Sequence, residues 1–136
     1  MNHSDFDYIK YFTAHEVETT GADLGGVEYE TIHMLDRARS IIGWPIKLMK
    51  NGLTTGNHSS TEHPEGRAVD FACPGGDPVK VALALSLVGF HGIGVYRNHR
   101  GAYSFHADRR QSSATWYGTK SSPRSQWAYK QLKFEE

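Results

Sequence analysis

The chain has 136 residues, and its 15 lysines and arginines are balanced by 15 aspartates and glutamates. This length suits one domain with a single core. The zero net charge gives no long-range attraction to nucleic acid or to an anionic membrane, so neither is expected as a partner. A mean hydropathy of −0.55 and scattered apolar residues argue against a membrane span. No signal peptide is visible, and the lone Cys73 excludes an intrachain disulfide.

The first third of the chain is predicted to be helical. Aromatic residues cluster within residues 1–20 and indicate a short packed element, in which Thr13 and Glu16 have the spacing of a capping box. Apolar side chains then recur at helical spacing over residues 27–42. Gly43 suits the position just after a helix, so we expect the helix to end there.

The rest of the chain is predicted to contain short strands and one more helix. Segments that are rich in β-branched and aromatic residues, or in which polar and apolar residues alternate, predict strands over residues 45–49, 67–71, 92–96 and 103–108. The last two are expected to form a hairpin. An apolar helix is expected over residues 79–88, and residues 119–136 form either a short C-terminal helix or a polar tail. This order favours an α+β fold in which helices flank a small antiparallel sheet, as a single domain over residues 1–136.

Two segments, Thr61–Asp70 and Ser104–Asp108, contain residues of the types that bind zinc. Side chains alternate along a strand, so Asp70 and His106 both face away from their apolar neighbours. If the two strands are neighbours in the sheet, His63, Asp70 and His106 converge on one ion. Catalytic zinc sites use three such ligands and leave a position open to water. Zinc held in this way lowers the pKa of water to roughly 7 and polarises a carbonyl group, as peptide hydrolysis requires.

These segments also resemble a known family. T-E-H-P-E-G-R-A-V-D at residues 61–70 resembles the S-x-H-x-x-G-x-A-x-D signature of the zinc D-alanyl-D-alanine carboxypeptidases, a family that includes phage L-alanyl-D-glutamate endopeptidases. F-H-A-D-R at residues 105–109 is similar to its second motif, and Y-F-T-A-H-E at residues 11–16 resembles its Y-F-T-x-x-E start. The resemblance implies a Hedgehog/DD-peptidase fold, Zn²⁺ bound by His63, Asp70 and His106, and a peptidoglycan stem peptide as substrate.

The chain departs from the family where an arginine often binds the substrate. The family often has S-G-Y-R after the Pro-Ile strand, whereas this chain has K-L-M-K-N-G at residues 47–52. Lys47 and Lys50 are candidate substrate-binding residues in its place, although lysine lacks the two-pronged guanidinium. The alternative is that both lysines are on a solvated strand face. His58, in the polar loop before the first motif, is predicted to be solvated or to face the substrate rather than to bind the metal; a ligand role is the alternative.

The catalytic base is also unusual. Some members place an acidic residue three positions before the last histidine ligand, but this chain has Tyr103 there. Asp108 is the candidate catalytic residue, as a general base or as an acceptor that orients an imidazole. A salt bridge from Asp108 to Arg109 or Arg110 is the alternative interpretation.

The leading hypothesis is a zinc metallopeptidase that cleaves a peptide bond in cell-wall stem peptides, as a carboxypeptidase or an endopeptidase. Its size and lack of an export signal suggest a monomeric phage or prophage protein that acts on the wall after release or from the virion. One alternative is a non-catalytic zinc-containing module that binds peptidoglycan or serves in the virion structure. Another is a cytoplasmic dipeptidase that acts on free D-Ala-D-Ala.

Overall fold

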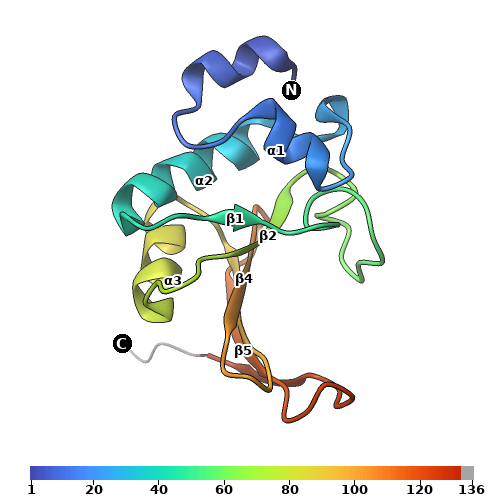
Figure 1. The fold of residues 1–136 in the computed structure, drawn as a ribbon, viewed down its shortest axis with the longest axis vertical. Coiled ribbons are helices and arrows are strands. Elements are labelled where there is room, and N and C mark those ends of the chain that lie inside the picture. The colour runs from blue at the N-terminus through green and yellow to red at the C-terminus, as the bar shows by residue number, and fades with distance from the viewer. Residues whose placement is uncertain (133–136) are drawn as a thin grey trace.

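A six-stranded sheet with the strand order β1-β2-β4-β3-β5-β6 organises the computed structural model, which describes residues 1–132 (Figure 1). Neighbouring strands are antiparallel except for β3 and β5, which are parallel. From β1 to β6 the strands span Lys47–Leu48, Ala68–Ala72, Gly92–Arg97, Tyr103–Asp108, Ala114–Thr119 and Ala128–Gln131. The predicted α+β class and the mostly antiparallel sheet are confirmed.

Helices precede β1 and connect β2 to β3. The α-helices are α1 (Ala14–Thr19), α2 (Tyr29–Ile42) and α3 (Pro78–Leu87), and short 3₁₀ turns span His3–Tyr8 and Leu24–Gly26. The predicted helices at 27–42 and 79–88 are thus confirmed to within two residues. Gly43 ends α2 with a left-handed φ of 68°, which glycine adopts without steric cost. Within residues 1–132 no helix is long and apolar enough to cross a bilayer.

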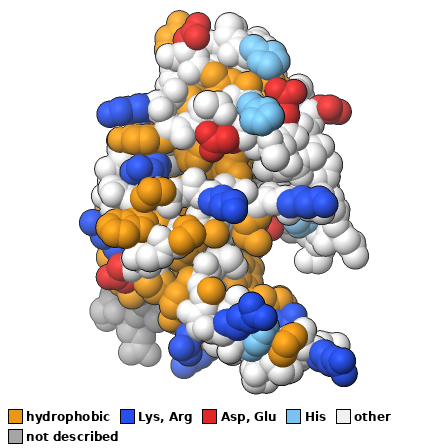
Figure 2. Space-filling view, in the orientation of Figure 1, with side chains coloured by type: hydrophobic (Ala, Val, Ile, Leu, Met, Phe, Trp, Pro, Cys, Tyr) orange, Lys and Arg blue, Asp and Glu red, His pale blue; other side chains and the backbone are white. Residues whose placement is uncertain are grey.

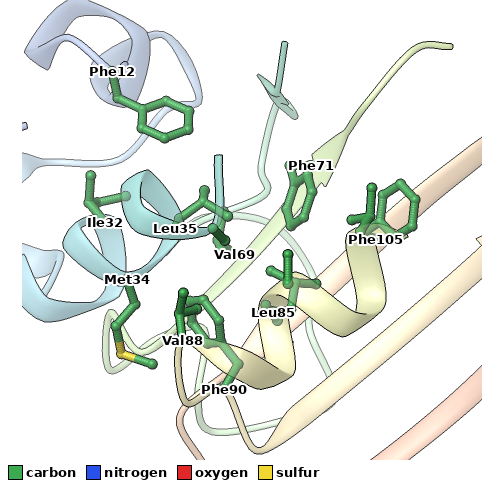
Figure 3. Close-up of a cluster of buried hydrophobic side chains, with 14 of the residues drawn as sticks. Phe12, Ile32, Met34, Leu35, Val69, Phe71, Leu85, Val88, Phe90 and Phe105 are labelled. Carbon is green, nitrogen blue, oxygen red and sulfur yellow. The ribbon is translucent and has the colours of Figure 1, made fainter. Parts of the chain in front are cut away.

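The apolar core lies between one face of the sheet and helices α2 and α3 (Figure 3). Phe71 of β2 and Phe105 of β4 are direct partners in the sheet, and their rings stack at a centroid distance of 5.4 Å. Ile32 and Leu35 of α2 and Leu85 of α3 are fully buried in the same cluster. Because side chains alternate, Asp70 and His106 lie on the opposite face, as predicted.

The C-terminal region differs from both sequence-based expectations. Residues 119–132 form neither a helix nor a polar tail: strand β6 lies there and pairs with β5, which extends the sheet beyond β3. The part of the predicted extension at residues 133–136 lies outside the described residues. The expected strand at residues 45–49 is shorter, with only Lys47 and Leu48 paired to β2. Strands β5 and β6 depend on pairing with distant residues, which local periodicity does not reveal.

Candidate metal centre

The loop of the first motif turns sharply before β2. Gly66 has a φ of 74°, and a Cβ there would collide with the backbone of residues 26–28. Its carbonyl oxygen accepts hydrogen bonds from the backbone N–H of Glu28 at 3.1 Å and from Oγ1 of Thr31 at 2.9 Å. Only glycine fits this position, both for its backbone conformation and for its packing. The turn places His63 over the sheet, where the side chain is almost completely buried.

The second and third candidate ligands come from adjacent strands. Asp70 in β2 and His106 in β4 are direct partners, and His106 is also paired with Gly94 in β3. The prediction that the two motif strands are neighbours is therefore confirmed. This pairing places both side chains on the sheet face that is turned away from the helices, within reach of His63.

The ligand atoms of His63, Asp70 and His106 lie close together. The separations are 2.9 Å from Nδ1 of His106 to Oδ1 of Asp70, 3.3 Å from Nε2 of His63 to Nδ1 of His106, and 3.4 Å from Nε2 of His63 to Oδ1 of Asp70. Tetrahedral zinc with bonds of about 2.0–2.1 Å requires ligand atoms to be separated by about 3.3–3.4 Å. The three atoms thus have nearly the spacing of one tetrahedral face, and they fit a zinc-sized ion.

The other nitrogen of each imidazole is held by an acceptor. Nδ1 of His63 donates to the carbonyl oxygen of Leu53 at 2.8 Å, and Nε2 of His106 donates to Oδ2 of Asp108 at 2.6 Å. A backbone carbonyl cannot donate, so Nδ1 of His63 carries the proton and Nε2 keeps its lone pair. Such outer contacts set the tautomer and ring orientation of metal-binding histidines.

The charges at the centre are strongly coupled. Burial alone would raise the pKa of Asp70, but the hydrogen bond from His106 and the charge of that imidazole outweigh burial and lower the pKa to about 2. Burial opposes the charged form of His106, but hydrogen bonds to Asp108 and Asp70 outweigh burial and raise its pKa. Without metal, the two carboxylates thus favour a proton on Nδ1 of His106. A cation at this point would replace that proton.

Asp108 is fully buried and leans across Gly92 of β3, its direct partner in the sheet. Besides His106, it binds Arg110, whose Nε lies 2.8 Å from Oδ1 and whose Nη2 lies 2.6 Å from Oδ2. Burial would raise the pKa of Asp108, but the hydrogen bonds from Arg110 and His106 hold it well below its usual range. Since both oxygens are engaged, the geometry favours the orienting role of Asp108 over the general-base role. The salt bridge to Arg110 is present, whereas Arg109 pairs with Glu28.

His58 lies directly beside the centre. Its ring stacks on that of His63 at a centroid distance of 3.6 Å, and His58, His63 and Asp70 form a group that could hold a metal ion, with ligand atoms within 4.8 Å of one another. The set that includes His106 is tighter, so we regard it as the primary set. Nε2 of His58 lies 2.8 Å from two backbone carbonyl oxygens, of Asn51 and Thr55, and must carry the proton. Its Nδ1 therefore retains a lone pair.

A cleft of about 590 Å³ opens over these residues, within the size range of ligand sites. Figure 2 shows a notch at the right-hand edge, between the upper part of the molecule and the lower end of the sheet in this view. His58, His63, Asp70 and His106 all line the cleft. Lys47 and Lys50 do not; they line a separate hollow beside α1. The structure thus does not bring these two predicted substrate-binding residues to the centre.

Sequence reasoning assigned no place in the cleft to Arg110 or Tyr96, which line it together with Trp116. The Arg110 guanidinium lies over the Trp116 ring at 4.9 Å, and Nε1 of Trp116 donates to the Tyr96 hydroxyl at 2.7 Å. Alternation along the predicted strand at 92–96 could have placed Gly94 and Tyr96 on one face. Arg110 lies outside the predicted strands and carried no comparable signal.

Comparisons with protein families, with curated proteins and with solved structures find no match for this chain. The function is therefore inferred from the geometry of the centre and from the motifs.

Proposed function

We propose that the protein is a zinc metallopeptidase that hydrolyses a peptide bond in peptidoglycan stem peptides. The observation that carries this proposal is the set of three ligand atoms, from His63, Asp70 and His106, which lie within 3.4 Å of one another in a cleft. The motif resemblance selects zinc, the Hedgehog/DD-peptidase fold and the cell-wall substrate from the wider range that this geometry allows. The mixed α+β architecture agrees with that selection.

The three ligands suit catalysis better than a purely structural role. Structural zinc sites are almost always closed by four protein ligands, whereas catalytic sites have three and an open position. Bound there, zinc would act as a Lewis acid toward the peptide carbonyl and lower the pKa of water. His63 and His106 are held in the tautomers that ligation needs, by Leu53 and Asp108 respectively.

Proton transfer is assigned to His58 rather than to Asp108. His58 lines the cleft and keeps a lone pair at Nδ1, because its Nε2–H is held by two carbonyl oxygens. In the hydrolysis water adds to the carbonyl carbon, the C–N bond breaks and the amine leaves with a proton. Nδ1 of His58 accepts the proton of the attacking water and can return it to the amine.

Arg110 is the cation that we assign to the substrate. It lines the cleft, and it pairs with Asp108 through Nε and Nη2, so that Nη1 is not used in the pairing with Asp108. Stem peptides carry carboxylates, and guanidinium is the side chain best suited to bind them. In this proposal Arg110 takes the role that the sequence-based interpretation gave to Lys47 or Lys50.

The test combines metal analysis with product identification. Purified protein should contain about one zinc per chain, and digestion of purified sacculi should release free amine groups, which a chelator suppresses and added zinc restores. Mass spectrometry of the muropeptides names the cleaved bond and separates carboxypeptidase from endopeptidase activity. Asp70→Asn is the matched inactive control. Folded, zinc-loaded protein that releases no amine from sacculi or from D-Ala-D-Ala would refute the peptidase proposal.

One observation favours the non-catalytic alternative. Among the described residues, Asp70 is the only acidic side chain that lines the cleft, so no second carboxylate is present to act as a base. If His58 does not take that role, the protein would bind zinc and peptidoglycan without turnover. Co-sedimentation with sacculi without amine release would identify this alternative.

A further inference from the structure

The Tyr96 hydroxyl occupies a distinctive place in the cleft. Tyr96 is in β3, which is paired with β4, and its side chain runs back over Gly94, the direct partner of His106. A Cβ at position 94 would collide with the Tyr96 hydroxyl and with the Trp116 indole. The absence of a side chain at Gly94 thus lets the hydroxyl lie beside the sheet position that is paired with His106.

The hydrogen bonds of this hydroxyl leave its proton available. Nε1 of Trp116 can only donate, so the phenolic oxygen of Tyr96 is the acceptor in their 2.7 Å hydrogen bond. Within residues 1–132 the Tyr96 O–H donates to no protein acceptor, and Tyr96 lines the cleft. Burial raises the pKa of Tyr96 to about 12, so the phenol keeps its proton at neutral pH.

The ring of Tyr96 is held in place by its neighbours. It makes edge-on contacts with Trp127 at 5.4 Å and with Tyr129 at 6.3 Å, measured between ring centroids. Its opposite partner in the parallel strand β5 is Gly118, where a Cβ would collide with the ring. A donor fixed in this way needs little reorganisation when charge develops nearby, which is what makes such groups effective in catalysis.

We propose that the Tyr96 O–H donates a hydrogen bond to the carbonyl oxygen of the scissile peptide bond and stabilises the negative charge that develops there. Tyr96 is then a catalytic residue, since it touches the reacting carbonyl; it keeps its proton throughout. This inference rests on the proposed peptidase function. It adds a neutral donor to the centre, on the side of the cleft formed by β3 and β5.

Tyr96→Phe tests the proposal, with Tyr103→Phe as the matched control. Tyr103 lines an apolar groove on the other side of the sheet, so removal of its hydroxyl should leave activity unchanged. Loss of one oxyanion donor lowers kcat by about 10²–10³-fold, and we expect this for Tyr96→Phe with KM within about threefold of the original value. Zinc affinity should be unchanged, because Tyr96 is not a ligand. Trp116→Phe keeps the hydroxyl and should lose less kcat than Tyr96→Phe.

A binding measurement separates this inference from the peptidase proposal. Inorganic phosphate is a tetrahedral oxyanion, and its affinity for the zinc-loaded protein can be measured by calorimetry. A hydrogen bond to a charged acceptor predicts affinity weaker by about tenfold or more in Tyr96→Phe. If the unmodified protein binds phosphate but cleaves no peptide, the peptidase proposal fails while the donor role of Tyr96 is still measured. Equal phosphate affinity in the two proteins, equal kcat, or no phosphate binding by either would overturn the inference.

Discussion

Replacing Gly92 with alanine should weaken zinc binding without changing any ligand. A Cβ at position 92 would lie closer than 3.0 Å to all three atoms of the Asp108 carboxylate group. Reaching ordinary contact requires the carboxylate to move by roughly 1 Å. That shift can stretch the 2.6 Å hydrogen bond from Nε2 of His106 by up to about 1 Å, and at about 3.6 Å no hydrogen bond remains. His106 then loses the contact that sets its orientation and its tautomer.

Loss of such an outer contact lowers metal affinity by about 10–100-fold, or about 1.4–2.7 kcal/mol. Competition with a chromophoric chelator measures this affinity. Gly25→Ala is the matched control, since a Cβ there meets no atom within 4 Å and should leave zinc affinity unchanged. The melting temperature of each variant shows whether the sheet is intact.

A double-mutant cycle then assigns the cause. If alanine at position 92 acts through Asp108, its effect on zinc affinity should disappear when Asp108 is already alanine. An effect of the same size in both backgrounds would refute this reasoning. So would a folded Gly92→Ala protein with unchanged zinc affinity.

Three further predictions follow from the same geometry. His63→Ala, Asp70→Ala and His106→Ala should each lower zinc affinity by more than the 10–100-fold expected for Gly92→Ala, whereas exposed His99→Ala should not; elemental analysis after dialysis measures this. His58→Ala should keep zinc and lower kcat by about 10²-fold or more, and full activity would reject His58 as the proton acceptor. Metal-free protein should be most stable between about pH 4 and pH 6.5 in thermal melts. Because the pKa of Asp70 is lowered from 3.8 to about 2, its ionised form adds about 2 kcal/mol to the free energy of unfolding. This contribution is present above pH 3.8 and is lost as the pH falls toward 2. Because the pKa of His106 is raised, its charged form stabilises the fold fully below pH 6.5, and this stabilisation is lost at higher pH. A melting temperature that stays constant from pH 6 to 9 would contradict this.

The sequence revealed elements whose signals are local. The helices at 29–42 and 78–87 have apolar periodicity and recognisable ends, so they were predicted closely: Gly43 follows the first, and Asp77 caps the second by accepting a hydrogen bond from the backbone N–H of Val79. Strand β6 has no such signal, because all four of its residues are exposed and no alternation marks a buried face. The parallel pairing of β3 with β5 joins distant segments and is invisible to any local pattern.

The candidate site divides in the same way. His63, Asp70 and His106 lie within motifs whose spacing predicted their convergence, and the pairing of Asp70 with His106 confirms that the two strands are neighbours. Arg110 and Tyr96 reach the cleft only because three strands pair in one particular register. The roles of Lys47 and Lys50 were inferred from an analogy of position, but both residues line another surface, beside α1.

The register of β2 against β4 decides whether the newly folded protein can bind the metal ion. If β2 slipped by a single residue against β4, Asp70 would turn into the apolar interior and Phe71 would be exposed in its place, while His106 kept its face. A divalent ion that needs both ligands cannot be captured by such a mispaired chain. Metal binding would therefore stabilise only molecules whose strands are paired in the native register.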